Sequence, residues 1–194
     1  MAFEEAKNLG KIKLIPKEAK TGKVNSRFAE DVINRGSIFF PRKDMETLKA
    51  CMQCGVCVGG CPSGRRTAWR IRRIFLKVLR GFEDDALKDE SLWECTTCYT
   101  CQERCLRKVM TTDIVRILRN LAVEKGYMNE NHVRVCMLLF KYGHAVPINE
   151  KIKTVRKELG LDEIPPTVHK YPEALNEVSL LVKETGFRLK VERS

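Results

Sequence analysis

Apolar positions spaced three and four residues apart predict two amphipathic helices in the middle of the chain. The first begins near Thr67, ends at Gly81, and has apolar positions at Ala68, Ile71, Phe75, Val78 and Leu79. The second begins near Thr112, ends at Gly126, and has apolar positions at Ile114, Ile117, Leu118 and Leu121. Glycine after the last apolar position is a common helix stop signal, which supports both boundaries.

A short helix is expected before each of two cysteine-rich segments that precede these longer helices. Asp44 can cap the one that carries Met45 and Leu48. Ser91, or the acidic residues just before it, can cap the one that carries Leu92 and Trp93. Because no alternating strand pattern flanks the cysteines, we predict an all-α fold with a duplicated unit of short helix, loop and long helix.

The chain divides into three predicted parts. Residues 1–43 are Lys-rich, broken by Pro and Gly, and are expected to be an extended N-terminal arm whose apolar pieces, KIKLIP and SIFFP, add binding surface for a partner. Residues 44–126 form the duplicated domain. Residues 127–194 are expected to be a helical C-terminal extension with helices near 130–142, 149–159 and 172–185, which packs on the core or docks a partner.

Eight of the nine cysteines form two copies of one spacing, C-x2-C-x2-C-x3-C. The first copy is Cys51, Cys54, Cys57 and Cys61. The second is Cys95, Cys98, Cys101 and Cys105, so that every position recurs 44 residues later. This spacing is typical of [4Fe–4S] clusters, and two copies predict two clusters and an electron carrier.

The ligand sets follow from how such runs bind in two-cluster ferredoxins, where the fourth cysteine of each run binds the other cluster. Carried onto this chain, cluster I takes Cys51, Cys54, Cys57 and Cys105. Cluster II takes Cys95, Cys98, Cys101 and Cys61. This crossed arrangement is a hypothesis; it would link the two halves of the domain, so that loss of the clusters unfolds it.

Zinc and disulfides are the alternative interpretations of the cysteines. Structural zinc usually uses two Cys pairs or Cys with His, whereas three cysteines in seven residues exceed a pair, and the three histidines lie far away in sequence. The chain begins MAFEEAKNLG, without an apolar leader, so reduced thiols and a cytoplasmic protein are expected. Cys136 lies in a predicted helix and is expected to be a buried, inert thiol.

The net charge of +11 is concentrated in residues 65–80, which hold seven Arg and Lys side chains and no acid. We favour a solvated helix face beside anionic clusters, or docking to an acidic partner, over nucleic-acid binding, because no nucleic-acid fold signature accompanies the patch. The longest apolar run, residues 135–140, is far too short to span a bilayer, so no membrane segment is expected.

The loops of the two runs differ in polarity. The first contains Met52, Val56, Val58 and glycines, and the second contains Thr96, Thr97, Tyr99, Thr100, Gln102 and Arg104. Because hydrogen bonds and positive charge near cluster sulfurs raise the reduction potential, we predict the higher potential for cluster II. Leu106 also stands where Pro62 follows the first run, but neither residue offers a ligand.

The paired runs resemble the α-helical ferredoxin domain, which also occurs in the iron–sulfur subunits of fumarate reductase, succinate dehydrogenase and anaerobic glycerol-3-phosphate dehydrogenase. The stretches CMQCGVCVGGCPSGRRTAWRIRRI and LGLDEIPPTVHKYPEALNEV are more closely similar to the C subunits of the soluble heterodisulfide reductases of methanogenic archaea. This similarity extends over roughly residues 35–190.

The resemblance implies a non-catalytic electron-transfer subunit in methanogenesis. It implies that electrons arrive from a bifurcating A subunit, which contains flavin, and leave to the B subunit, which reduces the CoB–CoM disulfide. Hydrogenase or formate dehydrogenase would join the larger complex. The sequence contains no adjacent cysteine pair of the kind found in the B subunit, and no nucleophile–base pair.

Two other functions remain open from the sequence. One is an iron–sulfur subunit of a membrane-linked dehydrogenase of the glycerol-3-phosphate or fumarate reductase type, which neighbouring genes would distinguish. The other is a basic iron–sulfur protein that binds nucleic acid, which a salt-dependent affinity would reveal.

Overall fold

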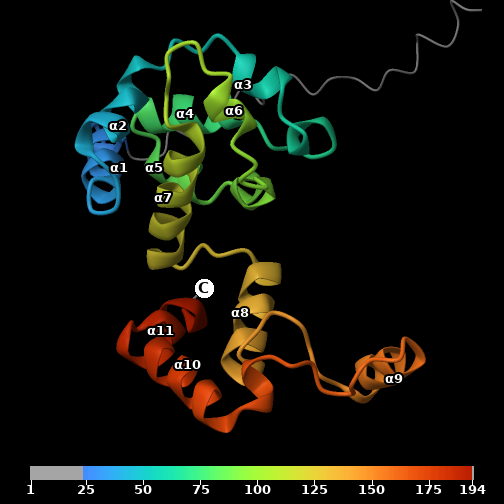
Figure 1. Ribbon diagram of the computed structural model, residues 1–194. Coiled ribbons are helices and arrows are strands. Elements are labelled where there is room, and N and C mark those ends of the chain that lie inside the picture. The colour runs from blue at the N-terminus through green and yellow to red at the C-terminus, as the bar shows by residue number, and fades with distance from the viewer. Residues whose placement is uncertain (1–23, 194) are drawn as a thin grey trace, which may run out of the picture.

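The computed structural model describes residues 24–193, which contain helices and loops and no β-strand. The all-α prediction is therefore confirmed for this part of the chain. Figure 1 shows a cysteine-bearing domain above a smaller helical extension, with α7 between them. The domain contains α1 (Phe28–Gly36), α2 (Arg42–Glu46), η2 (Thr47–Ala50), α3 (Val56–Gly59), η3 (Ser63–Arg65), α4 (Ile71–Leu79), α5 (Glu83–Leu87), η4 (Glu90–Glu94), α6 (Thr100–Glu103) and α7 (Thr111–Glu124).

The core of this domain lies where α1, α4, α5 and α7 pack together. The predicted apolar faces supply much of it: Ile71, Phe75 and Val78 from α4, and Ile114, Ile117 and Leu118 from α7, are buried. Met45 and Leu48, predicted on the first short helix, are buried as well. The short helices α3 and α6, which lie within the two cysteine runs, contact each other at one end of this core.

Helix α4 begins at Ile71, four residues after the predicted start at Thr67. The Thr67 hydroxyl accepts a hydrogen bond from the Trp69 backbone N–H at 3.2 Å, a local contact that competes with helix formation. Trp69 itself is 2% exposed, so the burial of its side chain holds the segment before α4 against the core. The first short helix also differs: it begins at Arg42 after Pro41, and the predicted cap Asp44 lies inside it.

The predicted N-terminal arm is only partly described, because residues 1–23 lie outside the described residues. Within residues 24–43 the structure differs from an arm. Helix α1 contacts α7, α2 and α4, and Phe28, Val32 and Ile33 are at most 1% exposed. Apolar residues at helical spacing thus fold this segment into the core. In contrast, Ile38 and Phe39 of the SIFFP piece are 65% and 61% exposed.

The extension contains α8 (Glu130–Tyr142), α9 (Glu150–Glu158), η5 (Val168–Lys170), α10 (Pro172–Glu184) and α11 (Phe187–Glu192). The three predicted helices match α8, α9 and α10, and Asn149 caps α9 through its side chain as expected. Helix α11 was not predicted, because Gly186 was interpreted as a final stop although it forms the N-cap of one more helix. Among the described residues, no helix is long and apolar enough to cross a membrane.

The extension has little core of its own. Val191 is its one buried residue among positions 127–193. It meets the cysteine-bearing domain where α11 contacts α7 and where the His132 ring lies 4.8 Å from the Trp93 ring. Large apolar side chains on its helices, including Val135, Leu181 and Leu189, are exposed.

Two isoleucines test whether α1 belongs to the core. Replacing Ile33, which is 0% exposed, by Ala removes buried methylene groups and is expected to lower the free energy of unfolding by about 2–5 kcal/mol. The matched change Ile38→Ala, at a side chain that is 65% exposed, is expected to alter it by about 0.5 kcal/mol or less. Anaerobic denaturant unfolding of the metal-loaded protein measures both. Equal effects would place α1 outside the core.

Candidate metal centre

The two cysteine runs fold into loops with the same backbone geometry. In the first, Gln53 and Gly55 have φ of 59° and 86°; in the second, Thr97 and Tyr99 have φ of 51° and 62°. The second member of each pair is the N-cap of the short helix that follows, α3 or α6. The repeat in the sequence is therefore also a repeat in the structure. Its second copy holds a tyrosine in the left-handed conformation that glycine adopts without strain.

One cavity brings together thiols from both runs. Cys51, Cys54 and Cys57 line it, and the fourth cysteine in its wall is Cys105, the last member of the second run. Arg72 and Arg107 also line it. These four cysteines are the set expected for cluster I, so the structure places that set around one space.

Cys61 lies with the second run. Burial is the main cause that raises the pKa of Cys95, and the nearby Cys101 and Cys61 thiols raise it further, while the backbone and Arg119 act in the opposite direction. Cys57 and Cys101 are also neighbours: burial, followed by the charges of Cys101, Cys51 and Cys54, raises the pKa of Cys57 to about 11. The two runs are therefore neighbours at Cys57 and Cys101, and Cys61 of the first run lies near Cys95 of the second.

The cysteine sulfurs receive hydrogen bonds of the kind that thiolate ligands accept. The backbone N–H groups of Gly64 and Val109 donate to the sulfurs of Cys61 and Cys105, each at 3.3 Å. The Gln53 amide donates to the Cys51 sulfur at 3.4 Å. Such donors stabilise a negatively charged sulfur. The residues present thus fit an anionic iron–sulfur group.

Within residues 24–193, no three Cys, His, Asp or Glu side chains converge closely enough to hold a single metal ion. A cubane imposes a different requirement, because each of its four cysteines binds a separate iron corner. A single zinc ion therefore requires its thiols to lie closer together than the four cysteines of a cubane do.

Hydroxyl groups gather at the second run, as the sequence of its loop predicted. Thr111, which is 3% exposed, donates from its hydroxyl to the Cys101 sulfur at 3.1 Å. The hydroxyl of Thr112 lies 3.6 Å from the same sulfur, and that of Thr100 lies 3.5 Å from the Cys98 sulfur. Thr111 and Thr112 were missed by sequence reasoning as site residues, because they follow the run by several residues. One sequence signal was available: Thr111 lies 44 residues after Thr67, the same offset that separates the two cysteine runs.

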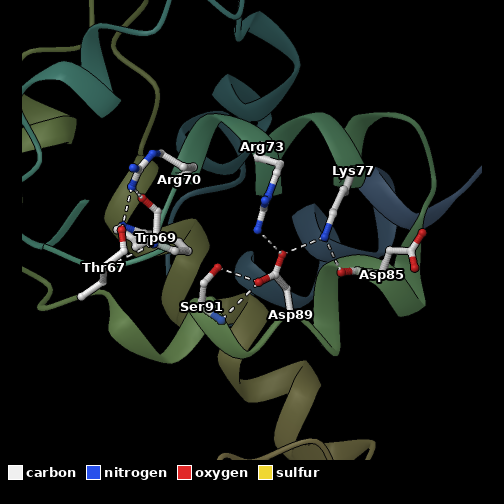
Figure 2. A network of polar contacts seen from close by, with 8 residues as sticks. All are labelled: Thr67, Trp69, Arg70, Arg73, Lys77, Asp85, Asp89 and Ser91. Atoms are coloured by element: carbon white, nitrogen blue, oxygen red, sulfur yellow. Dashed lines mark hydrogen bonds and ion pairs between the residues drawn. The ribbon is translucent and has the colours of Figure 1, made fainter. Parts of the chain in front are cut away.

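Three of the seven basic residues at positions 65–80 hold the polypeptide in place (Figure 2). Arg70 donates to the backbone carbonyls of Gly64, Thr67 and Trp69, at 2.6, 2.9 and 2.6 Å. Arg73 and Lys77 form ion pairs with Asp89 at 3.2 and 2.7 Å. These residues are therefore structural, in addition to their part in the positive charge near the cysteines.

Asp89 links α4 to the segment that leads into the second run. Besides the two ion pairs, its carboxylate accepts hydrogen bonds from the Ser91 N–H at 3.1 Å and the Ser91 hydroxyl at 2.6 Å, as Figure 2 shows. Burial alone would raise the pKa of Asp89, but Lys77, Ser91 and Arg73 hold it below its usual value. Asp89 is one of the acids predicted to cap this segment, and its side chain does so.

Arg119 also supports this segment. Its guanidinium donates to the carbonyls of Leu92 and Cys95, at 3.0 and 2.7 Å, and lies 5.6 Å from the Trp93 ring. Since Trp93 also packs against His132 of α8, the extension contacts the domain beside the second run. Cys136, on α8, was predicted to be buried but is only partly buried, and this partial burial raises its pKa.

Comparison with known proteins gives the family. Residues 47–109 match the family described as a 4Fe-4S dicluster domain. The iron–sulfur C subunit of the CoB–CoM heterodisulfide reductase of Methanopyrus kandleri is 50% identical over 164 residues, which cover 84% of this chain and 85% of that protein. The chain belongs to the family of heterodisulfide reductase C subunits. This family confirms the resemblance found in the sequence.

Two further relatives show the range of this family. The C subunit of the H2:CoB–CoM heterodisulfide, ferredoxin reductase of Methanothermobacter thermautotrophicus is 45% identical over 87% of this chain and 86% of its own length. The C subunit of the ferredoxin:CoB–CoM heterodisulfide reductase of Methanosarcina mazei is 53% identical over 71% of this chain and 85% of its own length. Within an oxidoreductase complex of this family, an iron–sulfur subunit fits a non-catalytic, electron-transferring role.

Replacing Asp89 by Ala tests whether its network holds the segment before Cys95. Asp89 is 9% exposed, and its loss leaves the Ser91 N–H without its acceptor and Lys77 with the Asp85 carbonyl alone, so the free energy of unfolding is expected to fall by about 1–3 kcal/mol. Asp162, which is 76% exposed, provides the control: its change to Ala is expected to cost about 0.5 kcal/mol or less. Anaerobic unfolding measures both, and an unaffected D89A protein would show that the network has no stabilising role.

Proposed function

We propose that this chain is the electron-transfer subunit of a cytoplasmic CoB–CoM heterodisulfide reductase. It relays electrons through two [4Fe–4S] clusters from a flavin-containing, bifurcating A subunit to the disulfide-reducing B subunit. The observation that carries the proposal is the cavity in which Cys51, Cys54 and Cys57 meet Cys105 of the other run. Together with the family, it favours a two-cluster carrier over a single metal site.

The proposed ligands are Cys51, Cys54, Cys57 and Cys105 for cluster I, and Cys95, Cys98, Cys101 and Cys61 for cluster II. Each cubane would supply one-electron storage at a potential that the surrounding protein adjusts. The chain's own residues hold the thiols, donate hydrogen bonds to their sulfurs, and bury one side of each loop against the core.

The positions of the cysteines support a relay with an entry and an exit. Cys57 and Cys101, one from each run, are close enough for their charges to interact. Cys54 and Cys98 are exposed, so each proposed cluster has an edge near the surface. An electron carrier between two proteins needs this combination of adjacent cofactors inside and accessible edges outside.

The two accessible edges have different chemistry. At cluster I, exposed Met52 and Val56 accompany Arg72 and Arg107. At cluster II, the neighbours of Cys98 are Thr97, Tyr99 and Thr100. Unlike surfaces are what two different partners, the A and B subunits, would require.

The C-terminal extension supplies further docking surface in this proposal. Its helices bury Val191 alone while they expose Leu180, Leu181 and Leu189, a composition that contact with another protein of the complex would stabilise. The curated relatives are named for H2 and for ferredoxin as electron sources. For this chain we propose a hydrogenase or a formate dehydrogenase as the outer donor, with neither nucleic acid nor membrane as a partner.

Anaerobic purification tests the proposed function. We expect roughly eight irons and eight sulfides per chain, from two cubanes of four irons each. We also expect two further proteins to co-purify, one containing flavin and one rich in cysteine, and the clusters of this chain to be reduced when the flavin protein receives electrons. A count of about four irons, or of none, would contradict the two clusters. A membrane anchor among the co-purifying proteins would support the dehydrogenase alternative.

A further inference from the structure

A set of polar side chains holds α6 against the beginning of α7. The carboxylate of Asp113, which is 4% exposed, accepts hydrogen bonds from the Tyr99 hydroxyl at 3.0 Å and the Gln102 amide at 3.1 Å. The other end of the Gln102 side chain accepts from the Thr112 backbone N–H at 3.0 Å. We name these four residues, Tyr99, Gln102, Thr112 and Asp113, the α6–α7 clamp.

The clamp exists in one of the two copies of the repeat. Shifting its members by 44 positions gives Gly55, Val58, Ala68 and Trp69. Gly55 and Val58 have no side-chain groups to replace the Tyr99 hydroxyl and the Gln102 amide, and Trp69, which is buried in the core, has no acceptor to replace the Asp113 carboxylate. The polar contacts around the second run are therefore a local difference between otherwise matching units.

The clamp surrounds a contact with a cysteine sulfur. Gln102 directly follows Cys101, and Thr112 directly follows Thr111. By joining Gln102 to Thr112 and Asp113, the clamp fixes the distance between the segments that carry Cys101 and Thr111. Those two residues make the hydrogen bond from the Thr111 hydroxyl to the Cys101 sulfur, at 3.1 Å.

The hydroxyl of Tyr99 adds a second constraint. Tyr99 has φ of 62°, a left-handed conformation that is strained for a non-glycine residue. Its hydrogen bond to the buried Asp113 offsets part of this strain. The bond therefore holds the backbone between Cys98 and Cys101 in the geometry that Gly55 adopts in the first copy.

We propose that Gln102 and Asp113 are positioning residues that make the two clusters unequal. They hold the Thr111 hydroxyl on the Cys101 sulfur and so raise the reduction potential of cluster II. Reduction adds negative charge to a cluster and its thiolates, and a hydrogen bond to a ligand sulfur stabilises the reduced state more than the oxidised one. This inference rests on the proposed two-cluster function.

The test uses the metal-loaded full chain in an anaerobic redox titration followed by electron paramagnetic resonance. The variants are Thr111→Val, Gln102→Leu and the double variant, none of which changes the charge of the protein. We expect each single change to lower the midpoint potential of cluster II by more than that of cluster I, because Thr111 donates to the Cys101 sulfur although it also lines the cavity of the first run. Because Gln102 acts through Thr111, the midpoint potential of cluster II in the double variant is expected to be no lower than in Thr111→Val alone.

Two matched variants separate this role from a structural one. Thr111→Ser keeps the hydroxyl and is expected to retain the wild-type potential. Thr67→Val alters the equivalent threonine of the first copy, whose hydroxyl donates to the Ser63 carbonyl at 3.1 Å, and is expected to leave both potentials unchanged. If Gln102→Leu loses iron, Tyr99→Phe takes its place, with the same expected lowering and the same lack of additivity with Thr111→Val.

The inference is wrong if Thr111→Val leaves the potential of cluster II unchanged, if the potentials of both clusters shift equally, or if the two single changes add in the double variant. Iron counts on the unaltered protein separate these results from a failure of the proposed function. If the chain contains two clusters but the potential of cluster II does not change in the variants, only the inference about the α6–α7 clamp is wrong. If the chain does not contain two clusters, the proposed function is wrong.

Discussion

The architecture depends on one requirement of coordination chemistry: a cubane takes four thiolates, and a short loop reaches three of its corners. In the proposed arrangement, the fourth thiolate of each cluster comes from the other run, so the two loops must lie side by side. The structure brings Cys105 to the wall of the cavity formed by the first run, and it brings Cys61 to the second. The core of α1, α4, α5 and α7 then serves as the rigid support on which two adjacent loops are presented.

The sequence was most informative where structure is determined locally. The cysteine spacing and the apolar faces of α4 and α7 could be predicted, because both follow from intervals of a few residues. Helix α1 was missed, because its apolar residues Phe28, Val32 and Ile33 lie in a segment whose Lys, Pro and Gly content indicated an arm. Packing against α7, which buries these residues, makes the segment part of the core. Likewise, no local pattern indicates that Thr111 contacts Cys101, because packing between separate segments creates that hydrogen bond.

A duplicated unit with two unlike copies suits the proposed relay of electrons from one partner to another. The first loop is apolar and flanked by arginines, whereas the second is rich in hydroxyl groups and carries the α6–α7 clamp. Differences in potential and in surface chemistry can thus arise from side chains, while the backbone geometry of the two loops stays the same. The extension beside the second run adds exposed apolar surface, which fits a protein that works between others.

The crossed ligation is the central claim, and spectroscopy of three single variants tests it most directly. In Cys61→Ser, Cys98→Ser and Cys54→Ser, the magnetic resonance signal of the reduced clusters shows which of the two clusters has lost a cysteine ligand. The crossed arrangement predicts that Cys61→Ser alters the same cluster signal as Cys98→Ser and leaves the signal altered by Cys54→Ser intact. If Cys61→Ser alters the same signal as Cys54→Ser, each run binds its own cluster and the account is wrong.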